Sequence, residues 1–97
     1  MILQAKEQQD YQEMLNRASD WANADRQKVD AHQFKGEALV MMAQAHQDDE
    51  EAITLCNKGR DCLQKALGLC TGQREPKEKE QLLEYQIRKS DKVKYFR

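Results

Sequence analysis

Small and apolar residues recur at helical spacing through the middle of the chain. Members of this series are three or four positions apart: Ala52, Cys56, Gly59, Leu63, Ala66 and Cys70. This spacing places them on one face of a helix that contacts another helix. Two further stripes, Leu55–Cys62–Leu69 and Ile53–Arg60–Leu67, follow other sides of the same helix. A helix with apolar residues on several sides lies between two neighbours, so we predict that this segment is the central helix of a bundle.

Gly59 lies in the middle of the series, although glycine inside a helix costs about 1 kcal/mol relative to alanine. Without a side chain, however, a helix allows a neighbouring backbone to approach closely, and the tighter packing can offset the cost. We therefore predict that Gly59 is a close contact between helices. The alternative is a glycine tolerated on the surface.

Two sets of end signals delimit the central helix and the helix that follows it. Acidic residues at 48–51 suit the first turn of a helix, and Gly72 is a natural C-terminal stop. Pro76 suits the first turn of the next helix, which we expect to run to about Phe96. Its apolar marks are Leu82, Leu83, Ile87 and Val93.

The segment before residue 47 divides less clearly. One helical face consists of Val29, Phe34, Ala38, Met41, Met42 and Ala45. Upstream of it, the helical period continues through Tyr11, Met14, Leu15, Ala18, Trp21 and Ala22. A single helix over residues 3–46 would be about 65 Å long, much longer than the central helix. Either it overhangs the bundle, and its apolar face supports self-association, or the chain breaks near residues 23–25 and folds back.

Length and composition favour one small helical domain. The chain has 97 residues, of which 34% are charged, and it contains a single proline. We predict an all-α fold, a three-helix antiparallel bundle over residues 26–97 with an extended or additional N-terminal helix over residues 1–25. The formal net charge of −1 does not favour sequence-independent binding of nucleic acid. No apolar run is long enough to cross a membrane, and the N-terminal sequence lacks the pattern of a signal peptide.

Residue types that often carry chemistry have structural explanations here. Three cysteines within one helix do not suggest a disulfide framework, so we interpret them as small core residues of a cytoplasmic protein. His32 and His46 lack zinc-ligand spacing and are expected on the surface. The acidic residues at 48–51 resemble a helix start more than a metal site, and the basic run at 88–97 is typical of a solvated helix face. We predict no catalytic residue, metal site or cofactor.

The central and last helices resemble those of the MIT (microtubule-interacting and transport) domain family. In EEAITLCNKGRDCLQKAL, the positions that match its second helix are Ala52, Ile53, Leu55, Gly59, Leu63, Ala66 and Leu67. The segment IRKSDKV at 87–93 is similar to the family's Leu-x-Arg-Ala-Glu-Lys-Leu signature. Two positions depart from the family: Cys56 replaces the usual aromatic residue, and Arg60 replaces an apolar one. The resemblance covers about residues 28–96.

This resemblance implies recognition of a partner rather than catalysis. MIT domains bind C-terminal tail helices of ESCRT-III subunits and recruit a parent ATPase, protease or deubiquitinase to endosomal or midbody membranes. The commonest mode lays an amphipathic helix into the groove between the second and third helices. The groove residues implied here are Ile53, Arg60, Leu67, Ile87, Asp91 and Lys94. Ile87 takes the place of the groove leucine, and Asp91 that of the acid that pairs with a ligand arginine.

Other readings of the same helices stay open. Without the resemblance, the spacing of Ile87 favours a core position; with it, a groove position is favoured. The whole chain also fits a structural module, either a spectrin-like three-helix rod element or a tetratricopeptide-like scaffold. A rod element would have helices of similar length and no exposed groove, and a tetratricopeptide scaffold would have a repeat of roughly 34 residues.

Overall fold

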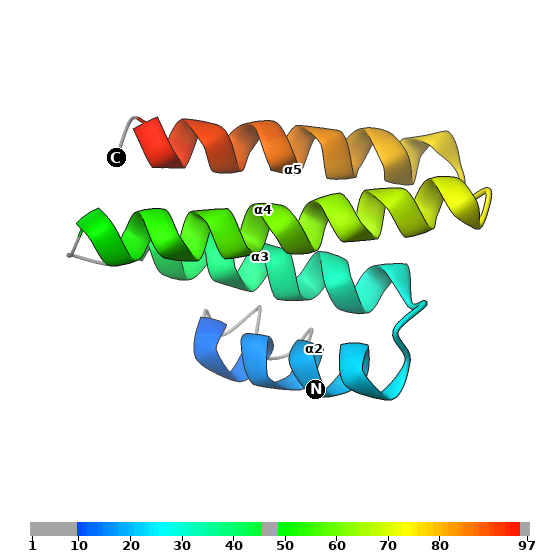
Figure 1. Ribbon diagram of the computed structural model, residues 1–97, viewed down its shortest axis with the longest axis horizontal. Helices are drawn as coiled ribbons and strands as arrows, with labels where there is room; N and C mark the ends of the chain where they lie inside the picture. Colours follow the sequence, from blue (N-terminus) through cyan, green and yellow to red (C-terminus); the bar gives the residue numbers. More distant parts are fainter. Residues whose placement is uncertain (1–9, 46–48, 96–97) are drawn as a thin grey trace.

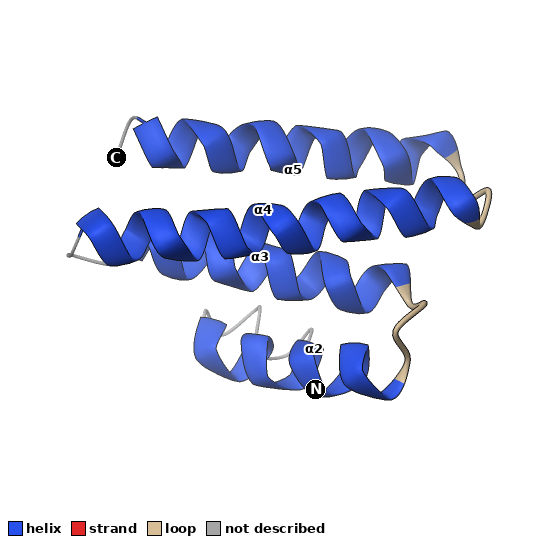
Figure 2. Ribbon diagram, viewed as in Figure 1, coloured by secondary structure: helices blue, strands red, loops and turns tan. Residues whose placement is uncertain are grey.

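The described part of the chain reverses direction three times and forms a bundle of four helices (Figure 1). The computed structural model describes residues 10–45 and 49–95, with side chains as far as Lys92. The helices are α2 (Tyr11–Ala24), α3 (Val29–Ala45), α4 (Asp49–Gly72) and α5 (Lys77–Tyr95). Figure 2 shows helices joined by loops and no strand among these residues. The predicted all-α class is therefore confirmed, and the N-terminal block contributes an additional helix.

The helix α4 is the central member of the bundle. It packs against α3 on one side and α5 on another, whereas α3 and α5 touch each other less extensively. Its buried residues are those of the predicted series: Ala52, Cys56, Gly59, Leu63, Ala66 and Cys70. The prediction from spacing is confirmed. Gly59 is buried and faces Gly36 of α3, so the alternative of a surface glycine is wrong.

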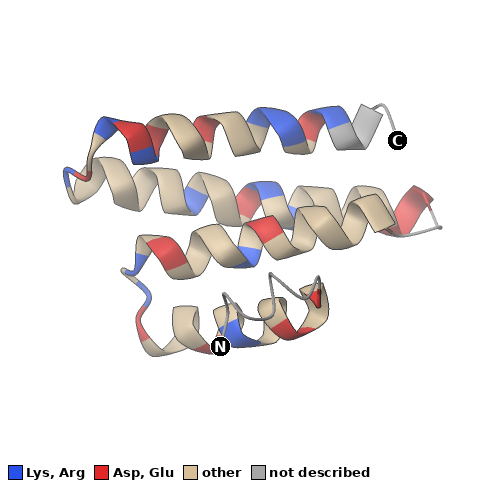
Figure 3. Ribbon diagram, turned by 180° about the vertical axis from the view of Figure 1, so that it is seen from behind, with Lys and Arg blue, Asp and Glu red and all other residues tan. Residues whose placement is uncertain are grey.

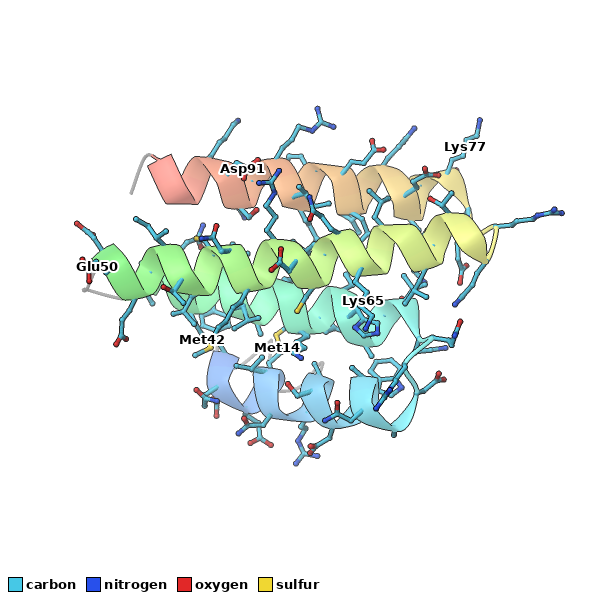
Figure 4. All side chains as sticks on the ribbon, viewed as in Figure 1. Met14, Met42, Glu50, Lys65, Lys77 and Asp91 are labelled. Atoms are coloured by element: carbon cyan, nitrogen blue, oxygen red, sulfur yellow. The ribbon has the colours of Figure 1, made fainter. Side chains whose placement is uncertain are left out.

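The N-terminal helix α2 folds back along α3 and does not overhang the bundle. Its first turn is capped by Asp10, whose Oδ1 accepts a hydrogen bond from the Glu13 amide at 3.1 Å. Met14, Ala18 and Ala22 are buried against α3, and Figure 4 shows Met14 pointing from α2 towards that helix. Of the two arrangements open from the sequence, the structure has the chain break after Ala24.

Aromatic stacking explains the position of Trp21. Its ring stacks on Phe34 of α3 with a centroid distance of 6.4 Å and an interplanar angle of 25°. The Lys28 ammonium lies 5.9 Å from the centroid of the indole ring, within the range of a cation–π interaction. These contacts fix the turn that joins α2 to α3.

The turn between α4 and α5 differs in detail from the prediction. Gly72 is the last residue of α4, but the left-handed backbone conformation belongs to Arg74, with φ of 56°. The amides of residues 73–75 bond back to the carbonyl groups of the last turn of α4, and these bonds close the helix. The Lys79 and Glu80 amides donate to the Pro76 carbonyl, so the predicted helix start at Pro76 is off by one residue.

Some expectations for single residues are wrong. His32 is only 6% exposed, since its Nε2 donates a hydrogen bond to the Arg26 carbonyl at 2.9 Å in the α2–α3 turn. Ala45 is exposed although its spacing continues the apolar face of α3, and Leu82, an apolar mark of α5, is 46% exposed. His46, Asp48 and Phe96 lie outside the described residues, as does the side chain of Val93. None of the described helices is long and apolar enough to span a bilayer.

Candidate peptide-binding grooves

A shallow groove runs between α4 and α5. Leu67 of α4 and Ile87 of α5 are half-buried and pack against the central hydrophobic cluster, which contains Leu63 and Leu83. The outer sides of Leu67 and Ile87 line the groove, together with Gln64, Glu84 and Arg88. Its apolar strip is therefore short and has polar rims, as a site for an amphipathic segment requires.

An ion pair connects the two helices beside this groove. Arg60 Nη1 of α4 lies 3.5 Å from Asp91 Oδ1 of α5, with 41% and 38% of the two side chains exposed. Such an exposed pair contributes about 0–1 kcal/mol to stability. The Arg60 Nε atom is buried and has no hydrogen-bond partner, so this arrangement leaves one donor of the guanidinium unsatisfied. Figure 4 shows Asp91 on the side of α5 that faces α4.

The structure brings four of the six predicted groove residues together. Arg60, Leu67, Ile87 and Asp91 lie along the α4–α5 boundary. Ile53 lies two helical turns before Arg60 and is 37% exposed, but it does not line this groove. Lys94 belongs to α5, and its side chain lies outside the described residues.

A second groove, between α3 and α5, is deeper and more apolar. Its walls and floor include Val40 and Met41 of α3, Leu63 of α4, and Leu82, Tyr85 and Gln86 of α5; Glu37 and Lys89 complete it. Its volume is about 90 Å³, which is room for one aliphatic side chain. Leu82 and Tyr85 are 46% and 60% exposed, and the Oε1 atom of Gln86 is buried without a hydrogen-bond donor.

Sequence reasoning missed this second groove. The sequence pattern counted Leu82 among the apolar marks of α5 and Met41 within the apolar face of α3, and neither was predicted to line a groove. The available signal was the pair Leu82 and Leu83, since adjacent residues lie about 100° apart on a helix and a helix covered on one side buries only one of them. Leu83 is fully buried and Leu82 is exposed.

The helix α5 separates the two grooves and is asymmetric in charge. Its first turn contains Glu78 and Glu80, and its second half carries Arg88, Lys89 and Lys92. Figure 3 shows acidic segments in the first half of α5 and mainly basic ones later. Arg88, Lys89 and Lys92 line a common surface of α5 together with Tyr85. A partner in either groove would therefore contact basic side chains.

The three cysteines lie in α4. Cys56 and Cys70 are buried, as predicted for core residues, and Cys62 is half-buried. Burial raises the pKa values of Cys62 and Cys70. The described residues contain no group of three histidine, cysteine or acidic side chains arranged to hold a metal ion.

Comparison with models of known protein families, with curated proteins and with solved structures gives no match to this chain. The chain is therefore a small all-helical domain, with four helices among the residues described, and no family is identified.

Proposed function

We propose that this domain is a protein-interaction module that holds an amphipathic helix of a partner against α5, in the manner of MIT domains. The observation that carries the proposal is the pair of half-buried apolar side chains, Leu67 and Ile87, that line the α4–α5 groove. They lie beside the ion pair of Arg60 and Asp91. The resemblance in sequence implies an apolar anchor and an acid at these α5 positions. The expected partners are the C-terminal tails of ESCRT-III subunits, and the expected place of action is the cytoplasmic side of endosomal or midbody membranes.

Arg60 distinguishes this groove from the pattern that the resemblance implies. In that pattern, the acid at the position of Asp91 is free to pair with an arginine of the ligand. In this chain, the carboxylate of Asp91 already forms an ion pair with Arg60. A ligand arginine has to displace Arg60, which is inexpensive because the exposed pair contributes about 0–1 kcal/mol and because Arg60 Nε gains an acceptor if it moves.

The lengths of the helices favour a binding module over a spectrin-like rod. The described helices have 14, 17, 24 and 19 residues, whereas a rod element requires helices of similar length. The exposed grooves on both sides of α5 also argue for a partner.

The α3–α5 groove is a second candidate for the partner site. Leu82 and Tyr85 are the most exposed large apolar side chains among the described residues. The unpaired Gln86 Oε1 in its floor offers an acceptor to a backbone N–H of an incoming segment. The same module could therefore hold an apolar segment on either side of α5, and variants must separate the two.

Fluorescence polarisation with a panel of labelled ESCRT-III tail peptides tests the proposal. We expect saturable binding of one or a few tails at micromolar concentration, near −8 kcal/mol. Ile87→Asp should abolish binding if the α4–α5 groove is used, and Leu82→Asp should abolish it if the α3–α5 groove is used. Gln81→Asp, on the exposed side of α5, adds the same charge and should leave affinity unchanged.

Ile87 also contacts the core, so each variant requires a circular dichroism spectrum and a thermal melt. Arg88→Glu provides an independent probe, because Arg88 is exposed on the groove rim and its replacement should leave the fold intact. If no tail binds the folded wild-type domain, the proposed partner class is wrong. If Ile87→Asp, Leu82→Asp and Gln81→Asp bind equally well, neither groove is the site.

A further inference from the structure

A polar cleft lies away from both grooves, where the end of α2, the α2–α3 turn, α3 and α4 meet. Its volume is about 330 Å³. The lining residues are Ala22, Asn23, Arg26, His32, Lys35, Asp61, Cys62 and Lys65. None of them lines either groove beside α5. Figure 4 shows Lys65 on α4 next to α3, so the cleft is built by residues far apart in the sequence.

Positive charge exceeds negative charge in this cleft. Arg26, Lys35 and Lys65 oppose one carboxylate, that of Asp61, which leaves an excess of two positive charges without counting His32. Ion pairs between described residues engage Arg17, Arg60 and Lys79 but none of the three cations of the cleft. The domain as a whole has a net charge of −1, so this excess is local.

The backbone beneath the cleft is held in place by His32. This side chain is buried, and its Nε2 lies 2.9 Å from the Arg26 carbonyl oxygen. Because a carbonyl oxygen only accepts, Nε2 carries the proton and donates it. The bond fixes the α2–α3 turn against α3, and the stacking of Trp21 on Phe34 holds the same region from the side of α2. The backbone at Arg26 is therefore held in place, and its exposed side chain extends from a fixed point beside the cleft.

The positive charges of Lys35 and Lys65 both act on the thiol of Cys62 in the cleft. Burial raises the pKa of Cys62, and both Lys35 and Lys65 oppose this effect, while Asp61 adds to it. Lys35 of α3 and Lys65 of α4 are thus close enough to the same thiol for their charges to reach it. Lys35 and Lys65 therefore bring two positive charges from different helices to one cleft, where Asp61 is the single opposing carboxylate among the lining residues.

We infer that this cleft binds the dianionic phosphate group of a phosphate monoester. An excess of two positive charges matches a dianion, which a phosphate monoester becomes above its second pKa of about 6. The Arg26 guanidinium can donate two parallel hydrogen bonds to phosphate oxygens, and Lys35 and Lys65 act as point charges on either side. The inference is independent of the proposed partner groove, because no residue is shared.

Titration with glycerol 3-phosphate and with inorganic phosphate at pH 7.5 and constant ionic strength tests the inference. Binding is followed by amide chemical shifts in two-dimensional NMR spectra of the full chain and by the rate at which iodoacetamide alkylates Cys62. We expect saturable shifts around Arg26, Lys35 and Lys65. Alkylation of Cys62 should slow, because the bound anion shields the thiol and disfavours the thiolate.

The double variant Lys35→Gln/Lys65→Gln should bind at least about tenfold more weakly, since it removes both charge-assisted hydrogen bonds that the lysines donate. The matched control is Lys58→Gln/Lys77→Gln, which removes the same charge from exposed residues outside the cleft. Equal affinity of the two double variants would overturn the inference, because general charge then explains binding. Absence of saturable shifts in the wild-type chain would overturn it as well.

A phosphate monoester occurs both in soluble metabolites and in the headgroup of phosphatidate. Co-sedimentation with phosphatidylcholine vesicles, with and without phosphatidate, separates these sources. Recruitment that requires phosphatidate and the two cleft lysines assigns the site to a lipid headgroup. Binding of glycerol 3-phosphate without recruitment to vesicles assigns it to a soluble ligand.

Discussion

The backbone of Gly36 in α3 lies directly against the backbone of Gly59 in α4. A Cβ atom added to Gly36 would be 2.7 Å from the Gly59 carbonyl oxygen, and one added to Gly59 would be 2.9 Å from the Gly36 carbonyl oxygen. Neither distance is compatible with van der Waals contact. The two glycines therefore set how closely the central helices approach, and the neighbouring Val40 and Leu63 pack around the crossing.

Replacement of either glycine by alanine should destabilise the domain, although alanine is the better helix former. The gain in helix propensity is about 1 kcal/mol, while overpacking against a backbone carbonyl costs about 1–3 kcal/mol. We expect a net loss of up to about 2 kcal/mol for Gly36→Ala and Gly59→Ala, and a larger loss for Gly59→Leu, measured by urea unfolding.

Gly68 is a matched control within the same helix. It is exposed, and a Cβ atom at this position would meet nothing within 4 Å. Gly68→Ala should raise stability by up to about 1 kcal/mol and the melting temperature by about 4–8 °C. If Gly36→Ala is as stable as Gly68→Ala, the close approach of the two helices is absent in solution.

The central helix was predictable because burial between two neighbours leaves a regular signal. Its small and apolar residues repeat every three or four positions, and all six members of the series are buried. The partner glycine was not predictable. Gly36 lies in a segment whose apolar residues surround the helix on several sides, so the sequence does not single out one contact face.

Other features depended on tertiary contacts that sequence patterns do not contain. The turn at residues 25–28 has no proline or glycine, and the chain breaks there because α2 gains burial against α3. The burial of His32 depends on a carbonyl acceptor in that same turn. Of the candidate site, the positions of Arg60 and Asp91 followed from the resemblance, but their ion pair across α4 and α5 required the structure.

Met14 anchors α2, and its truncation should loosen that helix selectively. Met14 is buried and packs with Ala38, Leu15 and Phe34 in a cluster apart from the main core. Met14→Ala should cost about 2–5 kcal/mol. Because α2 packs mainly on α3, hydrogen exchange should accelerate more in α2 than in α4, whereas Gln12→Ala, at an exposed position, should change neither quantity.

The melting of Met14→Ala, followed by Trp21 fluorescence and by circular dichroism, gives a second test. Trp21 belongs to α2, whereas most of the helical signal comes from α3–α5. We expect the fluorescence transition to occur at a lower temperature than the loss of helicity. Coincident transitions in the variant would mean that all four helices unfold as one unit.

The ion pair between Lys79 and Asp30 should make stability depend on pH in the alkaline range. Lys79 Nζ lies 2.6 Å from Asp30 Oδ1 and connects α5 to α3. This hydrogen bond raises the pKa of Lys79. The folded state therefore holds the Lys79 proton more tightly than the unfolded state does. The stabilisation from the ion pair is fully present below the ordinary lysine pKa of about 10.4. It is lost as the pH rises through the pKa of Lys79 in the folded state.

The free energy of unfolding of wild type minus that of Lys79→Gln isolates this effect from the titration of cysteine and tyrosine. We expect a difference in the free energy of unfolding of about 0.5–1 kcal/mol at pH 8, since both side chains are partly exposed. Above about pH 11, which is roughly half a unit above the ordinary lysine pKa, this difference should be smaller. Lys77→Gln is the control, because Lys77 is exposed and has no ion pair among the described residues. A difference for Lys79→Gln that stays constant over this range would contradict the assignment.

The three thiols should react in a fixed order with iodoacetamide. Cys62 is half-buried in the polar cleft, whereas Cys56 and Cys70 are buried within the helix interface. Cys62 should be alkylated first, and the other two only when the bundle opens. Because burial raises the pKa of Cys62 and the thiolate is the reactive form, the alkylation rate of Cys62 at pH 7.5 should be lower than that of a free cysteine and should keep rising at higher pH.

Peptide mass spectrometry after timed labelling measures all three rates, and Gly36→Ala should accelerate the labelling of Cys56 and Cys70 more than that of Cys62. Labelling of Cys70 at the rate of Cys62 in the wild-type chain would show that the α4 interface opens without global unfolding.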